Sequence, residues 1–251
     1  MREDYPKWFS PILGRNMECA VFSGEGEAER LCIAFPPQNG RFYDFGNFGM
    51  AESIAPWIEA GKIRLVCADG IDGETWSASD GDPRERIALQ ERWFRYVTDE
   101  LLPAFAVEGK GTLVCGCSMG GVHAGNFFFR RPDLFDAVIS LSGLFNAQYF
   151  FGDYMDETVY ANSPVHFLPN MPADHPWMEL YRCSRIILCC GQGAWEEDLL
   201  AGTLELDRIL TEKDIPHWTD LWGGDVSHDW VWWQKQLPYF FRSLAEDGYW
   251  G

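Results

Sequence analysis

Basic residues are scarce in this sequence. Its 251 residues include 20 Lys and Arg against 38 Asp and Glu, which gives a formal net charge of −18 at pH 7. A protein this acidic repels phosphate groups, so we expect neither nucleic acid nor an anionic membrane surface as a partner. Long hydrophobic runs are missing too, because no stretch approaches the roughly 18 apolar residues of a membrane span. The opening residues Met1–Asp4 mix charges and lead into no apolar signal-peptide segment, so the expected location is the cytoplasm.

The cysteines lack the spacing of a metal site. The chain has eight Cys but no C-x-x-C pair and no Cys/His ligand pattern, so no zinc site is predicted. Most of them lie in apolar runs such as Leu31–Phe35 and Ile186–Cys190, where free cysteine packs as a small hydrophobe. Internal repeats, low-complexity tracts and domain linkers are also missing. A length of 251 residues and a hydrophobic content of 47% therefore predict a single globular domain, residues 1–251.

Short apolar runs alternate with amphipathic segments along the chain. The expected strands are Met17–Phe22 (at the sheet edge), Leu31–Phe35, Ile63–Ala68, Gly111–Val114, Ala137–Leu141, Ser184–Cys190 and His217–Trp222. The expected helices are Gly49–Ala60, Pro83–Ala106 with a stop or kink at Pro103, His123 to about Arg131, Asp198–Lys213 and Val231–Ala245. This alternation predicts an α/β fold, with a mainly parallel central sheet and helices on both faces.

Two segments have no clean period. Residues 1–16 read as an irregular lead-in, and residues 144–181 read as an insertion with short helices on the substrate side. In open α/β sheets, ligands bind at the carboxyl ends of the strands. The loops that follow the strands are therefore where functional residues are expected.

One such loop carries the pattern Gly116-x-Ser118-x-Gly120, which is typical of a nucleophile elbow. A serine on a sharp strand-to-helix turn has strained backbone angles, and glycines two residues away on either side avoid a collision with the neighbouring backbone. The turn would hold Ser118 Oγ at a helix N-terminus, where free N–H groups favour developing negative charge. Ser118 is therefore the candidate nucleophile.

A serine nucleophile needs a base, and the chain has five histidines. Four are badly placed for this role: His123 on the helix behind the elbow, where it is expected to pack and point away from Oγ, His166 and His175 in the insertion, and His217 at the opposite end of the last strand. His228 follows the carboxyl end of the final strand and precedes the final helix. His228 is therefore the candidate base.

The base in turn needs an acid that orients it, and the loop after Cys190 offers Glu196, Glu197 and Asp198. Glu196 is the first choice because it falls in the loop itself. Glu197, the second choice, and Asp198 look like first-turn helix residues that complement the helix dipole. The sequence leaves the choice between Glu196 and Glu197 open.

Acyl transfer also needs two N–H donors for the oxyanion. The backbone of Met119, at the start of the helix, is one candidate. The other is expected from the loop after the strand Leu31–Phe35, where proline has no N–H and leaves Gln38 or Asn39, with Gln38 preferred.

With these residues the sequence resembles the putative-esterase branch of the α/β-hydrolase superfamily, which includes esterase D, feruloyl esterase and antigen 85 mycolyltransferase types. The residues that carry the resemblance are Gly116–Gly121, Cys190–Glu196, Ser227–Trp230 with Trp233, and Asn162–Pro164. It implies an α/β-hydrolase fold and a serine triad with neither a metal nor an organic cofactor. Relatives often place an aspartate shortly after the Cys-Gly-x-Gly turn, whereas this chain has Ala194 there.

Aromatic residues in or beside the carboxyl-end loops are candidates for lining a substrate pocket, with core packing or loop anchoring as the alternative for each. They are Phe42, Tyr43, Trp76, Trp195, Trp222 and Trp230.

Taken together, these motifs predict a serine hydrolase that cleaves a small-molecule carboxylic ester through an acyl-enzyme on Ser118. Two other functions stay open. One is an acyltransferase that uses the same triad, and the other is a non-catalytic α/β-hydrolase-fold interaction module.

Overall fold

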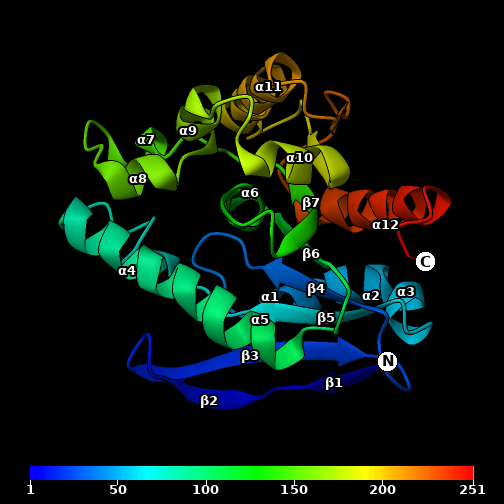
Figure 1. Cartoon of the computed structure of the whole chain (residues 1–251). Helices are drawn as coiled ribbons and strands as arrows, with labels where there is room; N and C mark the ends of the chain where they lie inside the picture. Colours follow the sequence, from blue (N-terminus) through cyan, green and yellow to red (C-terminus); the bar gives the residue numbers. More distant parts are fainter. Residues whose placement is uncertain (251) are drawn as a thin grey trace.

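The computed structural model describes residues 1–250, in which one nine-stranded sheet runs through the molecule in the order β1-β3-β5-β4-β6-β7-β8-β9, with β2 also paired to β3 (Figure 1). The strands are β1 (Arg2–Asp4), β2 (Lys7–Ser10), β3 (Arg15–Ser23), β4 (Arg30–Phe35), β5 (Ile63–Ala68), β6 (Thr112–Cys117), β7 (Phe135–Leu141), β8 (Arg185–Cys190) and β9 (Trp218–Leu221). β4 to β9 are parallel, and β3 is antiparallel to β5. The predicted α/β architecture is confirmed.

Helices cover both faces of this sheet, because alternate side chains of the buried strands point to opposite sides. The helices are α1 (Asp44–Asn47), α2 (Met50–Ser53), α3 (Ala55–Glu59), α4 (Pro83–Tyr96), α5 (Leu102–Phe105), α6 (Met119–Arg130), α7 (Gln148–Phe151), α8 (Glu157–Ala161), α9 (Pro164–Asn170), α10 (Pro176–Cys183), α11 (Glu197–Glu212) and α12 (Trp230–Glu246). Side chains such as Ile33 and Val114 pack with α4, α6, α10 and α11. Their neighbours, such as Ala34 and Cys115, pack with α1–α3 and α12.

The N-terminal segment differs from its prediction. Residues 1–16 were expected to be irregular, but β1 and β2 form within them and pair antiparallel with β3. The edge position expected for Met17–Phe22 is therefore wrong, since β3 lies between these strands and β5. All of β1 is exposed, so it carries no buried-strand hydrophobic pattern that a sequence could display.

Two predicted helices are interrupted. The segment Gly49–Ala60 forms α2 and α3, which meet at Ile54, where φ is −112° and the helix is broken. The segment Pro83–Ala106 stays helical but widens to a π-helical turn at Val97–Leu101, directly before α5. Pro103 lacks an N–H and cannot continue ordinary helical bonding, so the wider turn accommodates it.

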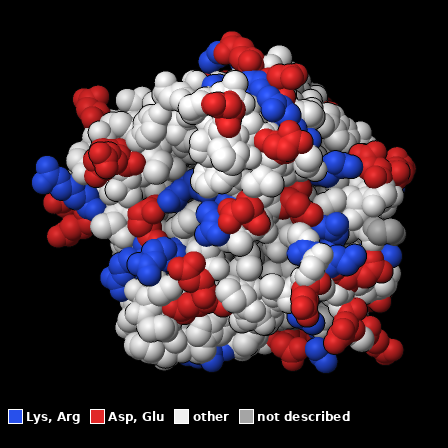
Figure 2. Space-filling view, in the orientation of Figure 1, with Lys and Arg blue, Asp and Glu red and all other residues white. Residues whose placement is uncertain are grey.

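The segment 144–181 contains the short helices α7, α8 and α9 and most of α10. On the face drawn in Figure 2, acidic and basic side chains are interspersed, and many basic groups lie beside an acidic one.

No helix within residues 1–250 is both long and apolar enough to cross a membrane.

Candidate active site

Ser118 lies on a sharp turn between β6 and α6, with φ 58° and ψ −124°. Its backbone N–H donates to the carbonyl of Leu141 at 2.8 Å, which ties the turn to the end of β7. A Cβ on Gly116 would lie 2.3 Å from the carbonyl carbon of Gly120, and a Cβ on Gly120 would lie 2.3 Å from the carbonyl oxygen of Phe35. Both glycines are thus required by close backbone approach, which is the steric condition of a strained nucleophile turn.

The Gly120→Ala substitution should lower the free energy of unfolding by about 2–4 kcal/mol, because neither β4 nor α6 can move away from the added methyl group without losing core packing. Urea unfolding followed by tryptophan fluorescence measures this. Gly224→Ala is the matched control, since the nearest atom to its Cβ would lie 4.0 Å away. An equal stability for the two variants would contradict the steric argument.

His228 lies in the loop between β9 and α12, and its Nε2 is 2.8 Å from Ser118 Oγ. The backbone N–H of His228 donates to the carbonyl of Ala194 at 3.0 Å, so the loop is tied to the one that follows β8. Its ring meets the indole of Trp233 edge to face, with centroids 4.8 Å apart and planes at 90°. The serine and the histidine, which are 110 residues apart in the chain, are thus held in hydrogen-bonding contact.

Glu196 lies on the other side of the imidazole, with its Oε2 3.4 Å from His228 Nδ1. That separation is longer than an ordinary N–H···O hydrogen bond. Glu196 is 1% exposed, whereas Glu197 and Asp198 are exposed in the first turn of α11. Of the candidate acids, the structure therefore brings Glu196 to the histidine.

Ser142 and Cys190 complete the surroundings of the Glu196 carboxylate. Ser142 Oγ donates to Glu196 Oε1 at 2.7 Å and accepts from Trp233 Nε1 at 3.2 Å. Cys190 Sγ donates to Glu196 Oε2 at 3.3 Å. Burial, followed by the charge of Glu196, raises the pKa of the Cys190 thiol, so it stays a protonated donor.

The role of Ser142 was missed from the sequence. Its φ of 53° places a non-glycine residue in the left-handed region, at the carboxyl end of β7. Only the dipeptide Ser142-Gly143 after the strand could have drawn attention to it, and nothing in that dipeptide indicates a carboxylate partner.

Two other polar groups near the elbow are buried away from the cavity. His123 is buried behind the elbow, as expected for a packing residue, and its Nε2 is 2.8 Å from Asp72 Oδ1. Cys117 precedes the serine directly, but burial raises the pKa of its thiol well above its usual range. Neither is therefore a competing nucleophile or base for the pocket.

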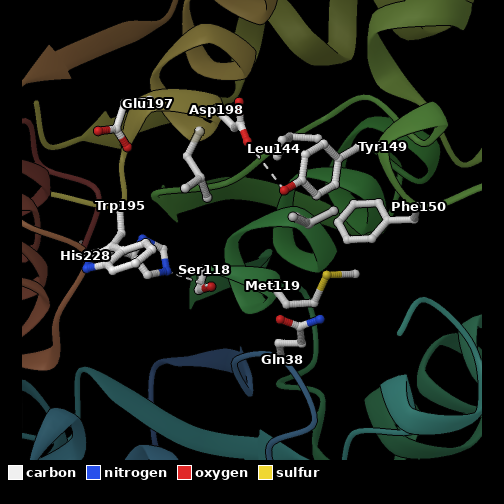
Figure 3. Close-up of a pocket in the computed structure, with 12 residues that line it drawn as sticks. Gln38, Ser118, Met119, Leu144, Tyr149, Phe150, Trp195, Glu197, Asp198 and His228 are labelled. Carbon is white, nitrogen blue, oxygen red and sulfur yellow. Dashed lines mark hydrogen bonds between the residues drawn. The ribbon is translucent and has the colours of Figure 1, made fainter. Parts of the chain in front are cut away.

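A cavity of about 340 Å³ opens above Ser118 and His228 (Figure 3). Its lining residues are Gln38, Ser118, Met119, Val122, Leu144, Tyr149, Phe150, Trp195, Glu197, Asp198, Leu199 and His228. In Figure 3 Trp195 lies beside His228, Glu197 and Asp198 lie along one edge, and Tyr149 and Phe150 lie along another. The cavity thus combines apolar and aromatic side chains with the carboxylates of Glu197 and Asp198.

Of the six aromatic residues proposed for the pocket, Trp195 lines the cavity, whereas its lining residues do not include Phe42, Tyr43, Trp76, Trp222 or Trp230. Phe42 is buried against Tyr5 and Tyr43, and Trp230 stacks on Phe48 with centroids 4.5 Å apart. Trp76 is 2% exposed and packs in a core cluster. Trp222 packs against Tyr239 of α12. Phe42, Trp76, Trp222 and Trp230 therefore pack against the core and anchor their loops, which was the stated alternative to lining a pocket.

The candidate oxyanion donors lie at the same cavity. Met119 is the first residue of α6, where the backbone N–H has no acceptor within the helix. Gln38 lines the cavity, whereas Asn39 does not, and Gln38 Nε2 donates to Ser77 Oγ at 2.9 Å. The loop that contains Gln38 and the turn that contains Ser118 thus both line this cavity. Among residues 1–250, no three His, Cys, Asp or Glu side chains come together in a way that could hold a metal ion.

Comparison with known proteins gives one family and many similar folds. The profile of the family described as "Putative esterase" matches residues 42–244. A ferulic acid esterase superposes with a TM-score of 0.74 at 18% identity, covering 96% of this chain and 98% of the other. An S-formylglutathione hydrolase from Agrobacterium tumefaciens gives 0.74 at 15% identity, covering 97% and 94%. Mycobacterium tuberculosis MPT51 gives 0.64 at 16% identity, covering 96% and 97%. These likenesses show the α/β-hydrolase fold, and no curated protein matches in sequence.

Proposed function

The chain belongs to the "Putative esterase" family, and we propose that it hydrolyses a small carboxylic ester through an acyl-enzyme on Ser118. The observation that carries the proposal is the arrangement of three side chains from separate loops. Ser118 Oγ lies 2.8 Å from one ring nitrogen of His228, and the Glu196 carboxylate lies 3.4 Å from the other. A nucleophile, a base and an orienting acid in this order are what acyl transfer requires.

In the first half of the reaction, His228 Nε2 takes the proton of Ser118 as Oγ attacks the carbonyl carbon of the ester. The negative charge moves to the carbonyl oxygen, where the backbone N–H groups of Met119 and Gln38 would donate to it. His228 then gives its proton to the leaving alcohol as the C–O bond breaks. The Glu196 carboxylate stabilises the imidazolium between these two steps.

In the second half, water takes the place of the alcohol. His228 accepts a proton from the water as it attacks the acyl carbon, and it returns that proton to Ser118 Oγ as the acid leaves. An added alcohol could attack in the same way, so product analysis with and without alcohol separates hydrolysis from acyl transfer. Labelling by a fluorophosphonate probe separates either enzyme from a non-catalytic interaction module.

Ser142 is the positioning residue for the acid, and its removal should slow the chemistry. In the Ser142→Gly variant, the loss of the hydroxyl frees Glu196 Oε1 while glycine keeps the backbone at φ 53° without strain. We expect kcat on p-nitrophenyl acetate to fall about 10-fold with KM nearly unchanged and with little loss of thermal stability. A change confined to KM would argue against this positioning role.

A further inference from the structure

The cavity above Ser118 is lined by two carboxylates that form no ion pair within residues 1–250 and by exposed aromatic rings. We propose that the ester it takes bears a cationic group, such as a quaternary ammonium, beside the ester carbonyl. This inference rests on the proposed function, because it concerns the substrate of the same site. It adds the chemical class of that substrate.

The carboxylates at the cavity have no counter-ion within residues 1–250. Glu197 and Asp198 both line the cavity and are exposed, and neither forms an ion pair with any residue in 1–250. Within the described residues 1–250, the two carboxylates accept one side-chain hydrogen bond, which Tyr149 Oη donates to Asp198 Oδ2 at 3.4 Å. The twelve lining residues include no lysine or arginine. An anionic ester would therefore meet like charge, whereas a cationic one would find its partner.

Aromatic faces lie beside these carboxylates. Trp195 is 80% exposed, which leaves most of its indole free to contact a ligand, and Tyr149 is 62% exposed. Both line the cavity together with Phe150. Electron-rich faces of tryptophan and tyrosine attract ammonium groups, and they do so most strongly for a cation that has little hydration to lose.

The backbone of Trp195 supports a role for its exposed ring. Its φ is 69°, in the left-handed region that a bulky residue enters only at a cost. A side chain that is 80% exposed gains little packing energy to offset that cost. Residue 195 directly precedes Glu196, so the strained turn both presents the indole at the cavity and carries the carboxylate to His228.

Apolar side chains of the same cavity suit the acyl group. Met119, Val122, Leu144 and Leu199 line it together with the carboxylates and the aromatic rings, and the whole cavity measures about 340 Å³. An ester of a short acid and a compact amino alcohol fits this lining, with apolar contacts for the acyl chain and with the carboxylates and aromatic rings for the cation.

A matched pair of substrates tests the charge directly. Butyrylcholine and 3,3-dimethylbutyl butyrate have nearly the same shape, but a quaternary nitrogen in the first replaces a carbon in the second. We expect kcat/KM to be about 10-fold higher for the cationic ester at low ionic strength. The ratio should fall toward 1 in 1 M NaCl, because salt screens exposed charges beyond about 3 Å at that concentration.

Variants connect that ratio to the residues named. The double substitution Glu197→Gln and Asp198→Asn, and separately Trp195→Gly, should each lower the ratio of cationic to neutral kcat/KM at least 3-fold. Glycine favours the backbone angle of residue 195, so the Trp195→Gly variant should fold at least as stably as the parent. Glu108→Gln removes the same charge from an exposed loop at the amino end of β6 and should leave the ratio as it is.

Each outcome decides one of the two proposals. Equal kcat/KM for the two esters, with turnover that needs Ser118, would overturn the cationic substrate and leave the esterase standing. A preference for a neutral sugar ester over butyrylcholine would also overturn the cationic substrate, if salt did not change that preference. If neither butyrate ester nor p-nitrophenyl acetate were hydrolysed, the proposed function itself would fail, and the substrate class with it.

Discussion

Replacing Ser118 with alanine should lower kcat on p-nitrophenyl acetate by about 10⁴- to 10⁶-fold and abolish labelling by a fluorophosphonate probe. The hydroxyl oxygen forms the acyl bond, so the methyl group of alanine leaves no route through an acyl-enzyme. The remaining rate would come from binding and from the N–H groups that face the cavity. Initial-rate kinetics and in-gel fluorescence measure the two effects.

The fold should survive this change. Ser118 holds its turn through the backbone N–H bond to Leu141, which alanine keeps, and through the neighbouring glycines. Circular dichroism and the melting temperature should therefore match those of the parent. Ser79→Ala, on an exposed loop residue, is the control for the same chemical change. Unchanged turnover in the Ser118→Ala enzyme would refute the proposed mechanism.

The second large effect is expected at Glu196. Glu196→Gln should lower kcat by about 10³- to 10⁴-fold, because a neutral amide stabilises no imidazolium and can hold the ring in the wrong tautomer. The amide NH₂ would also face Ser142 Oγ and Cys190 Sγ, both of which donate to the carboxylate. The loss should appear in kcat and in kcat/KM alike, as for an interaction made in the transition state.

Glu197→Gln is the matched comparison, since it makes the same chemical change one residue away. Glu197 is exposed at the cavity, and its carboxylate forms no hydrogen bond or ion pair with His228. On the neutral substrate p-nitrophenyl acetate, the kcat of Glu197→Gln should be at least 100-fold higher than the kcat of Glu196→Gln. A larger loss at Glu197 would transfer the role of the acid to that residue.

Much of the fold was predictable because it rests on local patterns. The strands Leu31–Phe35 and Ile63–Ala68 are buried on both faces, so they display continuous apolar runs, and the structure contains both as β4 and β5. The strands β1 and β2 were missed for the opposite reason. β1 is exposed throughout, and these short strands form through pairing with β3, which is a non-local interaction.

The elbow and the candidate base also had local signals. Gly116 and Gly120 flank Ser118 because backbone approaches too closely for a Cβ, and a steric requirement of this kind leaves its mark on the sequence. His228 could be chosen because it follows the last strand, and chain order alone places it at the carboxyl edge of a parallel sheet. The sequence by itself therefore determined the fold class and where Ser118 and His228 lie along it.

Only the tertiary structure separated Glu196 from Glu197, brought Ser142 to the acid, and assigned Trp195 to the cavity while Trp76 and Trp230 pack elsewhere. Two adjacent carboxylates have the same charge and the same propensities. Which one turns inward depends on the loops after β7, β8 and β9, which meet only when the sheet has formed. Side-chain direction in a loop is set by such long-range packing, and no periodicity in the sequence records it.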